Sequence, residues 1–175
     1  MDLIVVDLET TGLDTDVHSI LEVAAVNVAT GQELYFVPYI KPDQMMLADP
    51  EALRINRYYE RGVFRKMLKS PADNVQAYRE LFDMLKGNRL GGANPRFDAD
   101  MLVKATGYAE SWHYRLADVC AYVSGALGFD PSDIRGLHDV CVSLSVDTGT
   151  EHSALDDARA TAACFRTAAL GPRSR

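Results

Sequence analysis

The segment LIVVDLETTG at residues 3–12 places the tightest constraint on the fold. Its aliphatic run is typical of a buried core strand, and the acids Asp7 and Glu9 follow that run directly. Residues two apart on a strand point to the same face of a sheet, so the two carboxylates would project together. Two adjacent like charges repel unless a cation lies between them or one of them takes up a proton. Mg²⁺ and Mn²⁺ prefer such oxygen ligands, whereas an acidic end of an exposed strand is the simpler structural alternative.

The composition is that of a single globular domain. Of the 175 residues, 47% are hydrophobic, and we expect one domain over residues 1–170 with a flexible tail at 171–175. No apolar run approaches the ~20 residues of a membrane span, and the N-terminus lacks the pattern of a signal peptide. We therefore expect a soluble, cytoplasmic protein with no membrane partner. Three widely spaced cysteines without a C-x-x-C pair argue against a disulfide framework or a cysteine zinc site.

The charge distribution gives two opposing indications. A net charge of −7 argues against a polyanionic partner, because nonspecific nucleic-acid binding rests on clustered basic residues. A basic run nevertheless occupies residues 54–69, with Arg54, Arg57, Arg61, Arg65, Lys66 and Lys69. On a continuous helix its four arginines would share one face, although Gly62 weakens the helix. The simplest interpretation of the run is a solvated charged face, and only the family resemblance described below makes it a candidate track for a nucleic-acid strand.

The hydrophobic pattern predicts a mixed α/β fold. We expect strands at 2–7, 19–28 and 33–40 and a short segment at 89–93. We expect helices at 46–58 and 72–86, one that starts at 94, another that ends at about 127, one over 134–146 and one that starts at 153. The link ATGQ between the second and third strands indicates a hairpin. Strands come first and mostly helices follow, which favours a mixed sheet with helices packed on it.

Further acids occur where the middle of the chain turns from a strand to a helix. Asp98 and Asp100 follow GGANPRF, in which Asn94 and Pro95 are typical of a helix start. Acids in a first helical turn are favoured by the helix dipole alone, which is the structural explanation for both. Asp98 lies beside the apolar Phe97 and just after a short strand, where active-site groups of open α/β sheets gather. This position favours Asp98 over Asp100.

The segment EHSALDDARATAACF at residues 151–165 contains the last group of polar candidates. Ser153 can cap the final helix, and Asp156 in the first turn has a sufficient structural role there. Asp157 lies beside the stripe of small residues that would face the core, so its carboxylate points inward and needs a partner. His152 precedes the helix and can lean over the same site as a candidate base, although a histidine in a loop is more often simply solvated.

Together these motifs resemble the DEDDh family of 3′–5′ exonucleases, the DnaQ-like nucleases on a ribonuclease H-like fold. The residues that carry the resemblance are Asp7 and Glu9 in VVDLETTGLD, Asp98 in GGANPRFDADML, and His152 with Asp157 in HSALDDARAT. The segments HSILEVAAV and PEALRIN also look like family sequence, so the resemblance extends over nearly the whole chain. Each motif alone is modest, and their order and spacing make the combination specific.

The resemblance implies a ribonuclease H-like mixed five-stranded sheet, with the second strand antiparallel and helices on its faces. It also implies hydrolysis with two divalent cations, Mg²⁺ or Mn²⁺. One ion would be held by Asp7, Glu9 and Asp157, and a second would lie between Asp7 and Asp98. His152 would be the general base that deprotonates the attacking water.

The resemblance further implies which residues bind the substrate. Thr10, Thr11, Gly12 and Leu13 would line the pocket for the 3′-terminal nucleotide, and Asn56 stands in the substrate-side IN element. The partners implied are single-stranded 3′ ends of DNA or RNA, with a polymerase or a second copy of the chain as further candidates. The product would be a nucleoside 5′-monophosphate. Nothing in the sequence separates DNA from RNA.

Two other functions compete with the exonuclease. A haloacid-dehalogenase-type phosphatase is suggested by DLETT after a strand and by the acid pair at 156–157, but in that family the later acids end a strand instead of opening a helix. A non-catalytic nucleic-acid or polymerase-binding module on the same fold would be favoured if a catalytic acid were missing. None of the four acids is missing, so the enzyme is preferred.

Overall fold

The computed structural model describes residues 1–150 and 152–171. Its strands are β1 (Leu3–Thr10), β2 (Ile20–Asn27), β3 (Glu33–Phe36), β4 (Arg89–Gly92) and β5 (Ala117–Asp118). The helices are α1 (Pro42–Met45), α2 (Pro50–Ile55), the 3-10 helix η1 (Val63–Lys66), α3 (Pro71–Leu85), α4 (Pro95–Thr106), α5 (Val119–Leu127), α6 (Leu137–Leu144) and α7 (Ala154–Ala169). Apart from Gly171, the predicted tail at 171–175 lies outside the described residues.

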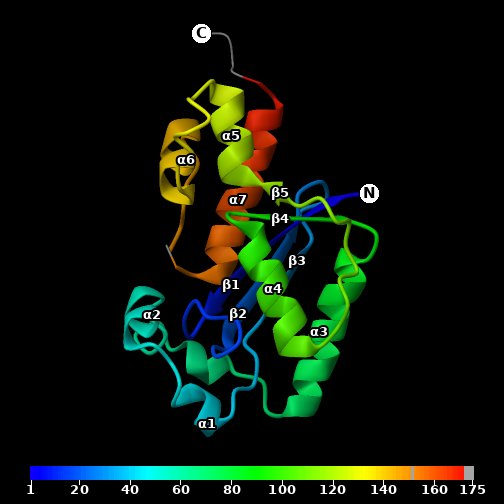
Figure 1. Cartoon of the computed structure of the whole chain (residues 1–175), viewed down its shortest axis with the longest axis vertical. Coiled ribbons are helices and arrows are strands. Elements are labelled where there is room, and N and C mark those ends of the chain that lie inside the picture. Colours follow the sequence, from blue (N-terminus) through cyan, green and yellow to red (C-terminus); the bar gives the residue numbers. More distant parts are fainter. Residues whose placement is uncertain (151, 172–175) are drawn as a thin grey trace.

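The strands form one five-stranded sheet in the order β3-β2-β1-β4-β5 (Figure 1). Strand β2 runs antiparallel to both of its neighbours, whereas β1, β4 and β5 are mutually parallel. This arrangement confirms the predicted mixed α/β sheet with one antiparallel strand. Two antiparallel connections, from β1 to β2 and from β2 to β3, and two crossovers through helices, from β3 to β4 and from β4 to β5, account for the topology.

The alternation of side chains along β1 assigns the two acids to one face of the sheet. Ile4, Val6 and Leu8 pack in a core with α3 and α4, while Val5 packs in a second core with α5, α6 and α7. Because side chains alternate along a strand, Asp7 and Glu9 continue the row of Val5 toward α7. The strand extends to Thr10, past the predicted end at residue 7, so both acids lie inside it.

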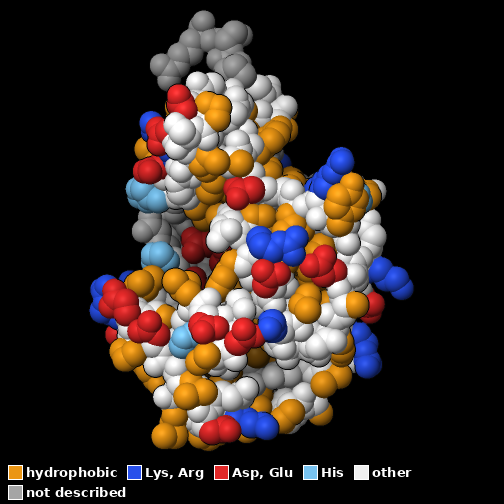
Figure 2. Space-filling view, viewed as in Figure 1, with side chains coloured by type: hydrophobic (Ala, Val, Ile, Leu, Met, Phe, Trp, Pro, Cys, Tyr) orange, Lys and Arg blue, Asp and Glu red, His pale blue; other side chains and the backbone are white. Residues whose placement is uncertain are grey.

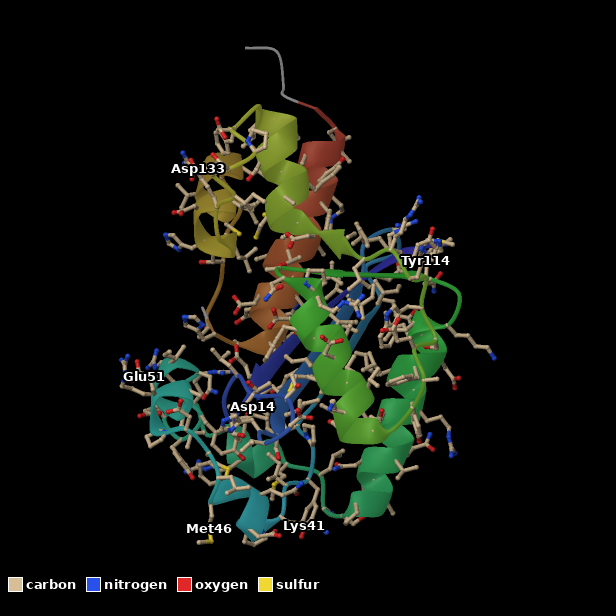
Figure 3. All side chains as sticks on the ribbon, in the orientation of Figure 1. Asp14, Lys41, Met46, Glu51, Tyr114 and Asp133 are labelled. Atoms are coloured by element: carbon tan, nitrogen blue, oxygen red, sulfur yellow. The ribbon has the colours of Figure 1, made fainter. Side chains whose placement is uncertain are left out.

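The predicted helix at 46–58 is wrong. Pro50 has no N–H to continue a helix from α1, and Asp49 accepts a hydrogen bond from the N–H of Glu51, which starts α2 afresh. Helix α2 ends at Ile55, and Arg57 has a left-handed backbone with φ of 51°. Met46, which the predicted helix would include, is 85% exposed and extends away from the body of the protein (Figure 3).

The break in this region also separates the basic residues of 54–69. The arginines at 54, 57, 61 and 65 do not share a helix face, because a run of turn residues at 56–62 and the 3-10 helix η1 follow α2. Arg54 pairs with Glu51 on the surface, and Arg61 pairs with the buried Glu22. The third strand is also shorter than predicted. It was expected over 33–40 and ends at Phe36, shortly before Pro38.

The three cysteines are buried, and none of them forms a disulfide. The sulfur atoms of Cys141 and Cys164 lie 3.5 Å apart where α6 meets α7. Over the residues that the structure describes, no helix has both the length and the apolar character needed to cross a membrane.

Candidate active site

The candidate site lies where β1 ends and α7 begins. In the space-filling view, acidic side chains lie at the bottom of a hollow between α6 and α2, with histidines beside it (Figures 1 and 2). Potential ligand atoms of Glu9, His152 and Asp157 all lie within 4.8 Å of one another, and the carboxylate of Asp7 interacts electrostatically with Asp98, Asp157 and Glu9. The structure therefore brings together the five polar residues selected from the sequence, which come from β1, α4 and the start of α7.

Asp98 reaches the site from the first turn of α4. Its Oδ1 accepts a hydrogen bond from the backbone N–H of Leu8 at 3.0 Å, which ties α4 to β1, and the residue is 5% exposed. A Cβ at Gly92 would lie 2.9 Å from the carbonyl oxygen of Val6, so only glycine lets β4 approach β1 this closely. Asp100 points elsewhere and pairs with Arg96 at 3.4 Å.

Neither expected N-cap side chain caps its helix. Asn94 and Ser153 occupy the N-cap positions of α4 and α7, but the side chain of neither makes a capping hydrogen bond. Asn94 has φ of 58°, so the chain turns sharply from β4 into α4. At α7, acids of the first turn bind the preceding loop instead: Asp156 accepts from the N–H of Thr150 at 3.2 Å and Asp157 from that of His152 at 3.0 Å.

Burial raises the pKa values of these acids, and for Asp7 and Glu9 the neighbouring acids add to the shift. Burial, followed by the nearby Asp157 and Glu22, raises the pKa of Glu9 from 4.5 to about 8. Burial raises the pKa of Asp98 from 3.8 to about 8, even though hydrogen bonds from backbone N–H groups oppose the shift. The pKa of Asp7 is raised well above its usual value by burial and then by Asp98, Asp157 and Glu9. Without a cation, the site therefore favours protonated carboxyls at neutral pH.

These shifts predict that the metal-free protein loses stability as pH rises. Because the folded-state pKa values of Glu9 and Asp98 lie above their unfolded values, the native state binds more protons between about pH 5 and 8. We expect a lower melting temperature at pH 8.5 than at pH 6 in the presence of a chelator. Mn²⁺ should raise the melting temperature more at pH 8.5 than at pH 6.

Two variants check the origin of this dependence. Glu9→Gln should reduce the difference in melting temperature between the two pH values, because it removes one ionisable carboxyl from the cluster. Glu80→Gln, on the exposed side of α3, should retain the full difference. A melting temperature that stays constant or rises between pH 6 and 8.5 in wild type would contradict the assigned shifts.

Four of the five residues predicted to bind the substrate share one pocket. A cavity of about 250 Å³ is lined by Thr10, Gly12, Leu13 and Asn56. Glu9 and Phe97 also line it, so the cavity adjoins the cluster of acids. Leu13 is 82% exposed and is free to contact a ligand. Thr11 is fully buried, and its hydroxyl accepts from the N–H of Ser19 at 2.9 Å, so it does not line the cavity.

The side chain of Asn56 is occupied by contacts within the protein. Its amide nitrogen donates to the carbonyl of Thr10 at 3.2 Å, and its amide oxygen accepts from the N–H of Tyr58 at 3.1 Å. The N–H of Asp49 donates to the carbonyl of Thr11 at 2.7 Å. These bonds hold α2 against the loop after β1, so the wall of the pocket is built by two segments. The role of Asn56 in substrate binding stays a prediction.

Sequence analysis missed Glu22 and Arg61. Glu22 lies opposite Glu9 in the β1–β2 register, is 1% exposed, and pairs with Arg61 through both carboxylate oxygens. An acid within the otherwise apolar strand SILEVAAVNV was the available signal for Glu22, because a buried charge needs a partner. No local pattern identifies Arg61 as that partner, since 39 residues separate the two.

Comparison with known proteins identifies the family through one family model. A model of the exonuclease family (RNase T) matches residues 4–165. The DNA polymerase III PolC-type protein of Thermotoga petrophila is 28% identical over 167 residues, which are 93% of this chain and 11% of that protein. The chain therefore spans about a tenth of the curated relatives that it matches.

Similar solved structures are exonuclease I proteins. The zinc-bound complex of E. coli exonuclease I with single-stranded DNA has a TM-score of 0.73 at 18% identity over 97% of this chain and 40% of that one. Exonuclease I from Methylocaldum szegediense has a TM-score of 0.68 at 20% identity over 95% and 40% of the two chains. These similarities show a shared ribonuclease H-like fold. Because the family model matches nearly the whole chain, the chain belongs to the exonuclease family, in its DEDDh (DnaQ-like) group.

Proposed function

We propose that this chain is a metal-dependent 3′–5′ exonuclease that hydrolyses the terminal phosphodiester of single-stranded DNA or RNA to a nucleoside 5′-monophosphate. The observation that carries the proposal is the convergence of four acids and His152 beside a pocket lined by Thr10, Gly12 and Leu13. The match to the exonuclease family supports the same activity.

The donor set suits hard divalent cations. The ligands are carboxylate oxygens that repel one another and hold protons at neutral pH, and a cation between them would remove that repulsion. We assign Asp7, Glu9 and Asp157 to one Mg²⁺ or Mn²⁺ ion, and Asp7 with Asp98 to a second. When bound, such ions lower the pKa of a water molecule and stabilise the charge that develops on the departing oxygen.

The roles of the remaining residues follow from their positions. His152 accepts the proton of the attacking water, since its ring lies close to Glu9 and Asp157 on the open side of the cluster. Leu13 packs against the terminal base, and the backbone around Gly12 follows the sugar. Asn56 shapes this wall through its hydrogen bond to Thr10.

Single-stranded DNA is the substrate to test first. Solved exonuclease I structures of the same fold contain a dT13 or a dA16 oligonucleotide, and the curated relative is a polymerase. We propose 3′ ends of single-stranded nucleic acid as the partner of the site. Attachment to a polymerase, assembly with a second copy and a cytoplasmic location stay predictions.

The activity is tested with a 5′-labelled single-stranded DNA and an RNA of the same sequence, each with Mg²⁺, Mn²⁺ or a chelator. We expect a metal-dependent ladder of products that shortens from the 3′ end, together with nucleoside 5′-monophosphates. A ladder from only one of the two substrates would identify the preferred nucleic acid.

Two outcomes would overturn the proposal. Binding of both oligonucleotides without shortening, in either metal, would favour a non-catalytic binding module. Release of inorganic phosphate from a monoester, without shortening of an unphosphorylated oligonucleotide, would favour a phosphatase.

A further inference from the structure

The backbone of His152 has a left-handed conformation that needs support from outside. Its φ is 58°, a value that residues other than glycine adopt at a cost and keep only when their surroundings fix them. Its N–H donates to Oδ2 of Asp157 at 3.0 Å, and its carbonyl accepts from Nη1 of Arg61 at 2.6 Å. Both polar groups of this residue are thus bound, one by a metal-ligand candidate and one by an arginine.

Arg61 is itself held in the sheet. Its guanidinium forms a bidentate pair with Glu22, with Nη1 2.7 Å from Oε1 and Nη2 2.9 Å from Oε2. The side chain of Arg61 is 15% exposed, and Glu22 also accepts from the hydroxyl of Tyr35 at 2.7 Å. A bidentate pair to a carboxylate on a central strand gives the guanidinium a defined direction.

The same guanidinium also contacts the wall of the pocket. Nη1 of Arg61 donates to the carbonyl of Asn56 at 2.9 Å, and the side chain of Asn56 holds the loop after β1. Arg61 therefore connects three parts of the site that are far apart in the sequence, namely β2, the end of α2 and the segment before α7.

We propose that Arg61 is a positioning residue that fixes the backbone of His152, so that the imidazole is aimed at the water that attacks the phosphodiester. This inference rests on the proposed function. The Glu22–Arg61 pair then affects catalysis indirectly, by holding His152, and neither side chain contacts the reacting atoms.

The test compares Arg61→Gln in two backgrounds. In the wild-type background we expect kcat on labelled single-stranded DNA to fall by about 10–100-fold with little change in KM, as for residues that orient a catalytic group. In the His152→Ala background, Arg61→Gln should cause no further loss, because the group that it positions is gone. Arg61→Lys should retain only part of kcat, since an ammonium group cannot reproduce the bidentate hydrogen bonds of a guanidinium.

A matched control shows that the loss belongs to this ion pair. Arg159 forms a bidentate pair with Glu33 that joins α7 to β3 on the surface, at 2.8 and 2.7 Å. Arg159→Gln should leave kcat unchanged. If the two arginine variants lose activity equally, or if Arg61→Gln lowers kcat by the same factor with and without His152, the proposal is overturned.

Hydrogen exchange tests the same contact without activity. Arg61→Gln should speed exchange of the amides of His152 and Ser153. In the double variant Arg61→Gln with Glu22→Gln, which removes both charges near Glu9, calorimetry should find a Mn²⁺ affinity close to that of wild type. Weakened Mn²⁺ binding with unchanged exchange would assign Arg61 an electrostatic role on the acids instead and overturn the proposal. An inactive wild type would refute the exonuclease, whereas the exchange experiment would still test the hold on His152.

A second variant guards against loss of folding. Removing Arg61 alone leaves the carboxylate of Glu22 buried without its cation, which is strongly destabilising. The double variant Arg61→Gln with Glu22→Gln removes both charges and keeps polar groups in place. It should fold and show the same loss of kcat and the same faster exchange at residue 152 as the single variant.

Discussion

Replacing Asp157 with Asn is expected to lower the rate of cleavage by about 10³-fold or more while the fold stays intact. The side chain lies with Glu9 and His152 in one cluster of ligand atoms, and its Oδ2 accepts the N–H of His152. Asn can still accept that hydrogen bond but brings no negative charge to a cation. The measurement is single-turnover cleavage of labelled DNA with Mn²⁺, alongside thermal unfolding of both proteins.

The neighbouring acid provides the control for this experiment. Asp156 lies in the same turn of α7, and its carboxylate is engaged by Thr150 and Arg159 away from the cluster. Asp156→Asn should therefore cleave at close to the wild-type rate. Full activity in Asp157→Asn would mean that this carboxylate is not a metal ligand, and the assignment of the site would fail.

The second large effect is expected at His152. Changing His152 to Ala should lower kcat by about 10²–10⁴-fold, the usual contribution of a general base. Mn²⁺ affinity should fall less than in Asp157→Asn, because the carboxylates remain. Free imidazole added to the variant should restore part of the rate, since it can occupy the space left by the side chain and accept the proton.

His113 is the matched control for the His152 variant. It stacks on Tyr114, which Figure 3 places far from the hollow, with ring centroids 4.5 Å apart. His113→Ala should leave cleavage unchanged. If His152→Ala weakens Mn²⁺ binding as much as Asp157→Asn does, His152 is a metal ligand and its role as the base is refuted.

Much of the fold could be predicted because its signals are local. The aliphatic run before Asp7, the hairpin link and the periodicity of 72–86 each correspond to an observed element. The direction of Asp157 followed from its place beside the small residues of α7, which pack on the sheet. Burial patterns repeat within a few residues, so one sequence suffices to detect them.

The parts that escaped prediction depend on contacts between distant segments. The break in the stretch 46–58 is an exception, because Asp49 and Pro50 are local signals that start α2 afresh and were outweighed by the apolar residues around them. Arg61 looked like one of several surface cations, and only its contacts with Glu22, Asn56 and His152 distinguish it. Such pairings leave no trace in hydrophobic periodicity.

The topology has a consequence for synthesis of the chain. Strand β1 is synthesised well before its parallel partner β4 and its covering helix α7. Domains generally fold as units, and pairings between distant segments form late. A nascent chain that ends before α7 lacks Asp157 and the helix that packs on β1 beside the acids. Under the proposed function, the domain would therefore begin to cleave nucleic acid only after α7 has been synthesised.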